Sequence, residues 1–309
     1  MFVHGGPGND VADYHNGNKR FFDASTFFVV EVDQRGTGNS QPSVRDDWRN
    51  MQYYKDISIE KMSADFELVR KALNINKWLV FGGSWGSTLS LDYGMRYPNR
   101  CIALIVRGIY LNTRIELDSV YSRQAHQHSP HELEAFDTWF ELAEKEASRA
   151  GEPPLDPNGT AGRVFQIYER MIQRGDRDAI WRWMTFENNL MEEVPSDLMD
   201  PVDIDEEMMP YAQSVSFFES RLYYHGTFED PVNLLARSSR LKGVKHTWIC
   251  QGSRDKVCPP QYAHELVGAL EATHVPYTAR FIEAAHEDSD PVMEQCLKDS
   301  VNDFLNAFS

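Results

Sequence analysis

The sequence of 309 residues has few cysteines, a deficit of positive charge and no long apolar run. No apolar stretch reaches about 18 residues and no signal peptide is recognisable, so we predict neither a transmembrane helix nor a secretory leader. The four cysteines lie far apart and lack metal-ligand spacing: Cys101, Cys250, Cys258 and Cys296. We therefore expect free thiols in a reducing compartment, and a cytoplasmic location.

The excess of acidic residues limits the kinds of molecule that the protein is expected to bind. The chain has 31 basic and 47 acidic residues, a formal net charge of −16, which disfavours nucleic acid and anionic membranes. Its apolar content of 41%, with seven Trp and 17 Phe, excludes a disordered chain. The length is sufficient for one large domain or two smaller ones.

Residues 82–86, Gly-Gly-Ser-Trp-Gly, follow the apolar run 78–81 and precede an apolar stretch with helical spacing. A strand, a sharp turn and a helix with a serine at the turn form the nucleophile elbow of serine hydrolases. A side chain at Gly82 or Gly86 is expected to clash in so tight a turn. We predict that Ser84 is the nucleophile; the alternative is a buried serine in a glycine-rich turn.

A second glycine-rich segment, His-Gly-Gly-Pro-Gly at residues 4–8, follows the apolar pair Phe2-Val3. Backbone N–H groups of Gly5 and Gly6 can approach a substrate carbonyl closely, and the N–H of Trp85 would supply another donor. Such donors form the oxyanion hole that acyl transfer requires. The alternative is an ordinary tight turn.

The acid and the base are expected far downstream. Asp255 follows the predicted strand 245–250, and His286 follows the predicted strand 279–282. Loops beyond the carboxyl ends of parallel strands meet at one edge of a sheet. The order Ser84, Asp255, His286 is that of a known type of catalytic triad. Taken singly, either residue could be an ordinary surface group, and the neighbouring acids are expected to be solvated or to cap helices: Glu283, Glu287, Asp288 and Asp290.

These motifs resemble the proline iminopeptidase (prolyl iminopeptidase) family of the α/β-hydrolase superfamily. Four stretches carry the resemblance: residues 4–8 (HGGPG), 33–40 (DQRGTGNS), 80–89 (VFGGSWGSTL) and 107–110 (RGIY). The resemblance implies an α/β fold with a mostly parallel sheet flanked by helices. It also implies an enzyme without metal or other cofactor that cleaves an N-terminal residue, preferably proline, from peptides or amides.

The sequence departs from the family pattern at the start of the chain. Related enzymes carry leading antiparallel strands before the glycine-rich loop, whereas only three residues precede His4. We therefore expect those strands to be missing, which would expose a sheet edge. Residues 27–32 are expected to form a strand, and the loop 33–40 after it to give structural support beside the oxyanion loop. Arg35 is expected in a local salt bridge.

The middle of the chain is expected to form an all-helical cap, residues 113–240, inserted between the catalytic-domain segments 1–112 and 241–309. No strand-like alternation of any length interrupts it. We expect the cap to close the site from above and to determine the choice of substrate.

Local signals define the helices of this cap. Ser129, Pro130 and Glu132 have the pattern of a capping box, in which the serine caps the helix and the glutamate reaches back. Further helices are expected over about residues 162–174 and 178–190.

Two cap segments resemble the family's substrate-binding motifs: residues 183–187 and residues 217–224. By this resemblance, Glu187 and Glu219 would hold the substrate's amino group, and Phe186 and Phe217 would pack against a prolyl ring. Phe186 stands where the family has tryptophan, which puts strict proline preference in question. The alternatives are solvated helix-face charges for the glutamates and plain core packing for the aromatic rings.

The sequence therefore predicts acyl transfer by Ser84, Asp255 and His286 on a small peptide or amino-acid amide with a free N-terminus. Two alternatives remain open: a general carboxylesterase or amidase with the same triad, and a non-catalytic, hydrolase-like binding protein. No nucleic acid, membrane or metal is expected to take part. The oligomeric state stays undetermined, and a monomer is compatible with the sequence.

Overall fold

A computed structural model describes residues 1–14, 20–191 and 206–308. The chain forms two compact units. The first consists of Met1–Ser40, Ile57–Leu111 and Asn233–Ser309, and the second of Gln41–Asp56 and Asn112–Val232. Residues 41–56, expected in the catalytic domain, thus belong to the second, helical unit, whereas residues 233–240, expected in the cap, belong to the first.

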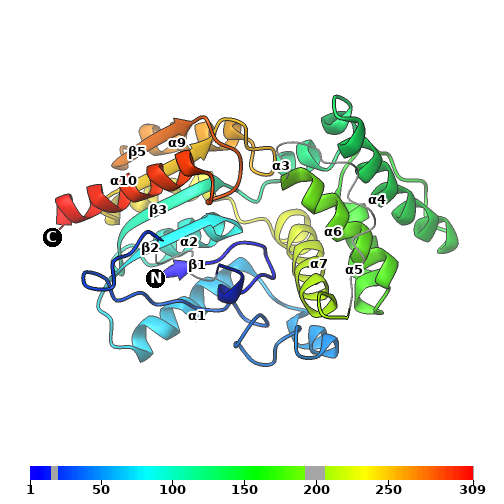
Figure 1. The fold of residues 1–309 in the computed structure, drawn as a ribbon, viewed down its shortest axis with the longest axis horizontal. Helices are drawn as coiled ribbons and strands as arrows, with labels where there is room; N and C mark the ends of the chain where they lie inside the picture. The colour runs from blue at the N-terminus through cyan, green and yellow to red at the C-terminus, as the bar shows by residue number, and fades with distance from the viewer. Residues whose placement is uncertain (15–19, 192–205, 309) are drawn as a thin grey trace. The chain divides into compact units, whose positions relative to one another are not determined.

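The first unit contains a five-stranded sheet in the order β1-β2-β3-β4-β5, with every neighbouring pair parallel (Figure 1). The strands are β1 (Phe2–Val3), β2 (Trp78–Ser84), β3 (Cys101–Ile109), β4 (Thr247–Gly252) and β5 (Tyr277–Ile282). The helices of this unit are α1 (Ile59–Ala72), α2 (Trp85–Arg96), α8 (Leu234–Arg237), α9 (Pro260–Ala272) and α10 (Pro291–Phe308). The predicted α/β class, a parallel sheet flanked by helices, is confirmed.

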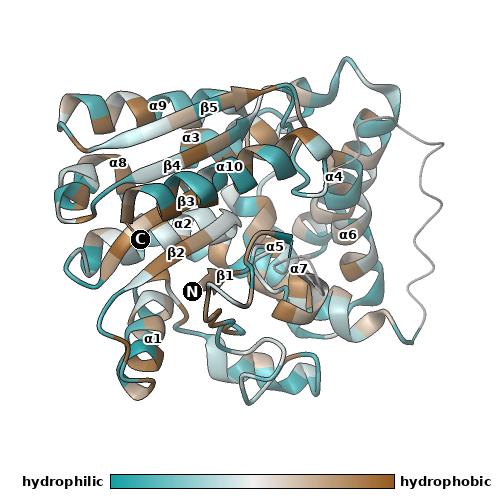
Figure 2. Cartoon of the chain, turned by 60° about the vertical axis from the view of Figure 1, so that its left-hand side comes forward, coloured by the Kyte–Doolittle hydropathy of each residue, from teal (hydrophilic) through white to brown (hydrophobic). Residues whose placement is uncertain are grey.

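The central strands β2, β3 and β4 are mostly buried, as strands of parallel sheets usually are, whereas the edge strand β5 is partly exposed. Alternate strand residues, among them Phe81, Ile105 and Trp248, join one apolar cluster with Leu297 and Phe304 of α10. Figure 2 shows α10 lying across this face. The opposite face packs against α2 and α9. Because both faces are covered, the loops at the carboxyl ends of the strands remain as the place for polar chemistry.

Residues 27–32 are not a strand, so the sequence prediction is wrong for this segment. The contacts to β1 are a single bridge between Phe2 and Glu31 and a hydrogen bond from the Phe2 N–H to the Val30 oxygen of 2.9 Å. Since β1 is only two residues long, it offers too few ladder positions to hold a neighbouring strand of six residues.

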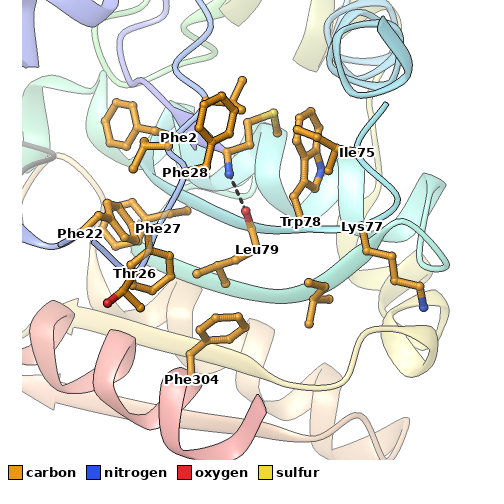
Figure 3. Close-up of a pocket in the computed structure, with 15 residues that line it drawn as sticks. Phe2, Phe22, Thr26, Phe27, Phe28, Ile75, Lys77, Trp78, Leu79 and Phe304 are labelled. Carbon is orange, nitrogen blue, oxygen red and sulfur yellow. Dashed lines mark hydrogen bonds between the residues drawn. The ribbon is translucent and has the colours of Figure 1, made fainter. Parts of the chain in front are cut away.

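An apolar pocket of about 410 Å³ lies beside this segment. Figure 3 shows aromatic side chains around it, including those of Phe2, Phe27 and Phe304. Phe28 also lines the pocket and is 82% exposed. The β1 side of the first unit therefore presents apolar surface.

Figure 1 shows the helices of the second unit. They are α3 (Arg114–Val120), α4 (Pro130–Arg149), α5 (Gly162–Gln173), α6 (Arg177–Met191) and α7 (Met209–Tyr224). The Ser129 hydroxyl caps α4 by accepting from the Glu132 N–H at 3.4 Å, as predicted. The Glu132 carboxylate lies 3.3 Å from Nδ1 of His126. Within the described residues, no helix is long and apolar enough to cross a membrane.

The segment 41–56 joins this helical unit through specific contacts. The Tyr54 carbonyl accepts from Nε of Arg221 at 2.8 Å, and the Tyr54 ring packs on Phe218. Arg221 and Phe218 both belong to α7. Arg221 also pairs with Glu169 of α5. A buried guanidinium needs such acceptors, because an unpaired charge in the interior is costly.

Cys250 and Cys296 form a disulfide, so the expectation of four free thiols is wrong for these two residues. They lie 46 positions apart in sequence, with Cα atoms 6.2 Å apart, because α10 packs on β4. Cys101 and Cys258 are free and buried. Since disulfides are typical of oxidising compartments, the cysteines no longer support a cytoplasmic location.

Reduction of this disulfide should lower the free energy of unfolding by roughly 2–4 kcal/mol, since the bond closes a long loop in the unfolded chain. The measurement is urea denaturation with and without dithiothreitol. The double variant Cys250→Ala/Cys296→Ala is the control and should not respond to dithiothreitol. Alkylation of four cysteines in unreduced, denatured protein would contradict the assignment; two are expected.

Candidate active site

Ser84 is the last residue of β2 and the N-cap of α2, with φ 56° and ψ −130°. This left-handed backbone conformation is strained for a residue with a side chain and is typical of functional turns. A methyl group on Gly82 would lie 2.5 Å from the Gly86 oxygen, and one on Gly86 would collide with the Val3 carbonyl. The predicted clashes at both glycines are therefore confirmed.

His286 and Asp255 lie together in the loops after β5 and β4. Nδ1 of His286 is 2.9 Å from Oδ2 and 3.0 Å from Oδ1 of Asp255, and both residues are buried. Oδ1 of Asp255 also accepts from the Cys258 N–H at 2.7 Å. Because an ionised carboxylate only accepts hydrogen bonds, it holds the proton of neutral His286 on Nδ1 and leaves Nε2 as the basic atom.

The carboxyl end of β3 lies between this pair and the serine. Ile109 pairs with Ser84 in the register of β2 and β3. The preceding Gly108 has φ +53°, and a methyl group there would lie 3.3 Å from Cε1 of His286 and 3.4 Å from Oδ2 of Asp255. The first unit thus places Ser84 at the end of β2, and the paired Asp255 and His286 in the loops after β4 and β5, on either side of the end of β3.

Arg107 supports the histidine loop, a role that sequence reasoning missed. Its Nη1 donates to the His286 carbonyl oxygen at 2.6 Å. A methyl group on Gly83 would lie 2.6 Å from Nε of Arg107, so the small residue beside Ser84 makes room for this side chain. The available signal was a charged residue within the apolar run of β3, which is unusual unless it is paired.

The glycine-rich loop follows β1 directly. Gly6 has φ +106°, and a methyl group there would lie 2.7 Å from the Gly8 nitrogen. Gly5 is buried beside it. Trp85 is fully buried and begins α2. The first N–H groups of a helix have no acceptor within the helix, so the Trp85 N–H is suited to bind an anion.

Within the second unit, Glu187 of α6 and Glu219 of α7 are buried carboxyl groups. The Tyr121 hydroxyl donates to Oε1 of Glu187, and Nε1 of Trp183 donates to Oε2 of Glu219 at 2.6 Å. Neither glutamate is therefore a solvated helix-face charge.

Burial dominates the electrostatics of this pair. It raises the pKa of Glu187 to about 7, against the opposing hydrogen bond from Tyr121. Burial, followed by the charge of Glu187, raises the pKa of Glu219 well above its ordinary value. Two buried acids that repel each other favour a state with fewer than two negative charges.

The aromatic residues predicted to contact substrate lie in packed surroundings. Phe186 packs on Trp139 with ring centroids 5.0 Å apart, and also contacts Phe136. Phe217 is fully buried and packs on Phe218. Sequence reasoning missed Tyr121 as a partner of Glu187, since no local motif joins residues 66 positions apart.

Among the described residues, no group of three or more His, Cys, Asp or Glu side chains is arranged to hold a metal ion. The expectation of a metal-free, cofactor-free enzyme stays a prediction.

Comparison with known sequences gives consistent results. A sequence model for the alpha/beta hydrolase fold matches residues 1–142. The probable proline iminopeptidase of Leptolyngbya boryana is 30% identical over 274 residues, covering 87% of this chain and 76% of that protein. The proline iminopeptidase of Neisseria meningitidis serogroup B is 29% identical over 314 residues, covering 99% of this chain and 88% of that protein.

Solved structures share the fold. The meta-cleavage product hydrolase of Pseudomonas fluorescens aligns with a TM-score of 0.55 at 14% identity, over 99% of this chain and 90% of that one. The proline iminopeptidase-related protein of Thermus thermophilus aligns with a TM-score of 0.51 at 18% identity, over 99% of this chain and 88% of that one. At these identities the structural likeness concerns the fold, whereas the sequence relatives identify the family. The chain is a hydrolase of the proline iminopeptidase family.

Proposed function

We propose that this chain is a serine exopeptidase that releases an N-terminal residue, preferably proline, from peptides or amides. The observation that carries the proposal is the buried carboxylate of Asp255 at 2.9 Å from Nδ1 of His286, beside the strand that pairs with Ser84. The relatives named proline iminopeptidase support the choice of substrate.

In the proposed mechanism, Nε2 of His286 takes the proton from Ser84 as its oxygen attacks the carbonyl carbon of the first residue. Asp255 keeps the imidazole in the required tautomer and stabilises the imidazolium. The N–H groups of Gly5, Gly6 and Trp85 hold the oxyanion. His286 then protonates the leaving amine, and water hydrolyses the acyl-enzyme.

The buried acids supply the proposed selectivity. A free N-terminus is a cation, and Glu187 and Glu219 offer it two carboxylates within an aromatic environment. Charged hydrogen bonds of this kind contribute about 1.5–3 kcal/mol each. The packing of a prolyl ring against Phe186 and Phe217 stays a prediction, as does a cytoplasmic location.

Proline β-naphthylamide should be cleaved, whereas its N-acetylated analogue should not, because acetylation removes the cation. Ser84→Ala should abolish turnover and labelling by a fluorophosphonate while the circular dichroism spectrum stays unchanged. Preference for the blocked amide or a p-nitrophenyl ester would indicate a general esterase or amidase with the same triad. Failure of the wild type to react with the fluorophosphonate would indicate a non-catalytic protein.

Asp255→Asn should lower kcat by around 10⁴-fold, because the histidine would lose the partner that fixes its tautomer. The matched control is Glu283→Gln, an exposed acid three residues before His286 that pairs with Arg254. This control should retain the wild-type rate. Equal rates for Asp255→Asn and the wild type would remove Asp255 from the mechanism.

Glu187→Gln should raise stability at pH 8 while it lowers activity. Folded Glu187, with its pKa raised to about 7, keeps a proton that the unfolded chain loses near pH 4.5. Its contribution to the free energy of unfolding therefore becomes unfavourable as pH rises from about 4.5 through 7. Removing this ionisation should add on the order of 1–3 kcal/mol at pH 8, whereas kcat/KM for proline β-naphthylamide should fall at least about 10-fold.

Urea denaturation at pH 4.5 and pH 8 measures the stability effect, which should be present only at the higher pH. Glu141→Gln, at an exposed position of α4, is the control and should change neither stability nor kcat/KM. For the wild type, KM of the free-amine substrate should rise as pH falls below about 7. A less stable Glu187→Gln protein at pH 8 would show that the ionised carboxylate stabilises the unliganded fold.

A further inference from the structure

Gln34 lies in the loop 33–40 and is buried. Its Oε1 accepts from the Trp85 indole Nε1 at 3.0 Å, and its Nε2 donates to the His4 carbonyl oxygen at 2.8 Å. An indole N–H can only donate and a carbonyl oxygen can only accept, so these two partners fix the orientation of the amide. Both polar atoms of this side chain are therefore engaged.

The backbone of Gln34 makes a third connection. Its N–H donates to Nε2 of His4 at 3.0 Å. A backbone N–H cannot accept, so Nε2 carries no proton and neutral His4 has its proton on Nδ1. That atom lies 2.9 Å from the Gly5 carbonyl oxygen, to which it donates. The fully buried His4 ring thus links Gln34 to the glycine-rich loop.

The loop that carries Gln34 is itself held in place. The Gln34 carbonyl accepts from both the N–H and the hydroxyl of Thr37, at 3.0 and 2.9 Å. Asp33 accepts from the N–H groups of Val11 and Asn39 at 2.8 Å each. These hydrogen bonds hold the backbone of Gln34 in one position.

Gln34 bonds to two segments that are 81 residues apart. One ends in the His4 carbonyl, directly before Gly5 and Gly6, and the other begins with Trp85. We propose that Gln34 is a positioning residue of the oxyanion hole, holding these segments so that their backbone N–H groups converge on one oxygen. This inference rests on the function proposed above, in which those N–H groups stabilise the oxyanion.

The expected effect follows from the geometry. Loss of one oxyanion donor typically costs about 100- to 1000-fold in rate, and a misplacement of about 1 Å costs about 100-fold. Gln34→Met keeps the length of the side chain but removes both hydrogen bonds. It should lower kcat about 10- to 100-fold, with KM within about twofold of wild type.

The test compares p-nitrophenyl acetate with its thiono analogue, neither of which requires recognition of an amine. A thiocarbonyl sulfur is a poor hydrogen-bond acceptor, so the ratio of the two kcat/KM values reports on the oxyanion hole and not on the triad. Gln34→Met should lower this oxygen-to-sulfur ratio by about 10-fold or more, since mainly the oxygen ester loses stabilisation.

The neighbouring Arg35 provides the control. Its guanidinium pairs with Asp65 at 2.7 Å at a half-buried position. Arg35→Gln removes a charged contact from the same loop without touching His4 or Trp85, and it should leave the oxygen-to-sulfur ratio unchanged. Trp85→Phe, which keeps a ring but loses the indole N–H, should act in the same direction as Gln34→Met and serves in its place if that variant does not fold.

The outcomes separate the two claims. Equal losses on both esters, or an unchanged ratio in a folded Gln34→Met protein, would overturn the positioning role while the serine mechanism stands. A wild-type protein that hydrolyses neither ester and resists the fluorophosphonate would overturn the proposed function, and this inference with it. In the double variant Gln34→Met/Trp85→Phe, the ratio should fall less than the product of the single effects, because both substitutions remove the same bond.

Discussion

The first unit depends on one close approach of backbone to backbone, that of Gly86 to the Val3 carbonyl. It fixes the start of α2 against the end of β1, and thereby sets the glycine-rich loop beside the serine turn. A side chain at Gly86 would force these segments apart. The buried polar contacts of Gln34 reinforce the same junction. The site is therefore set first by the space available to the backbone and only then by side-chain chemistry.

The buried acids of the two units have different hydrogen-bond partners. Asp255 accepts from the Cys258 N–H and lies against Nδ1 of His286. Glu187 and Glu219 each accept from an aromatic side chain, but burial outweighs these hydrogen bonds and raises both pKa values. Ionisation of this pair is therefore unfavourable in the unliganded fold.

Sequence reasoning succeeded where the signal is local. The turn at Ser84 and the helix cap at Ser129 could be predicted because glycine spacing and capping patterns report on neighbouring residues. The parallel sheet was expected from the family resemblance. Sequence reasoning failed for residues 27–32, whose apolar character is typical of a strand but whose two-residue neighbour β1 forms only a single bridge with them. The disulfide, Tyr121 and Gln34 depend on contacts between segments remote in sequence, for which a single chain carries no pattern.

The backbone conformation of Ser84 also restricts how this site can evolve. At φ 56°, a β-branched side chain would be a steric outlier, so threonine is excluded as a replacement nucleophile although it carries the same hydroxyl group. Unbranched groups at the β carbon, such as those of cysteine and aspartate, meet less steric resistance there. A change of reaction type at this position would therefore use a thiol or a carboxylate as the nucleophile. The turn could keep its backbone conformation while its nucleophile changes.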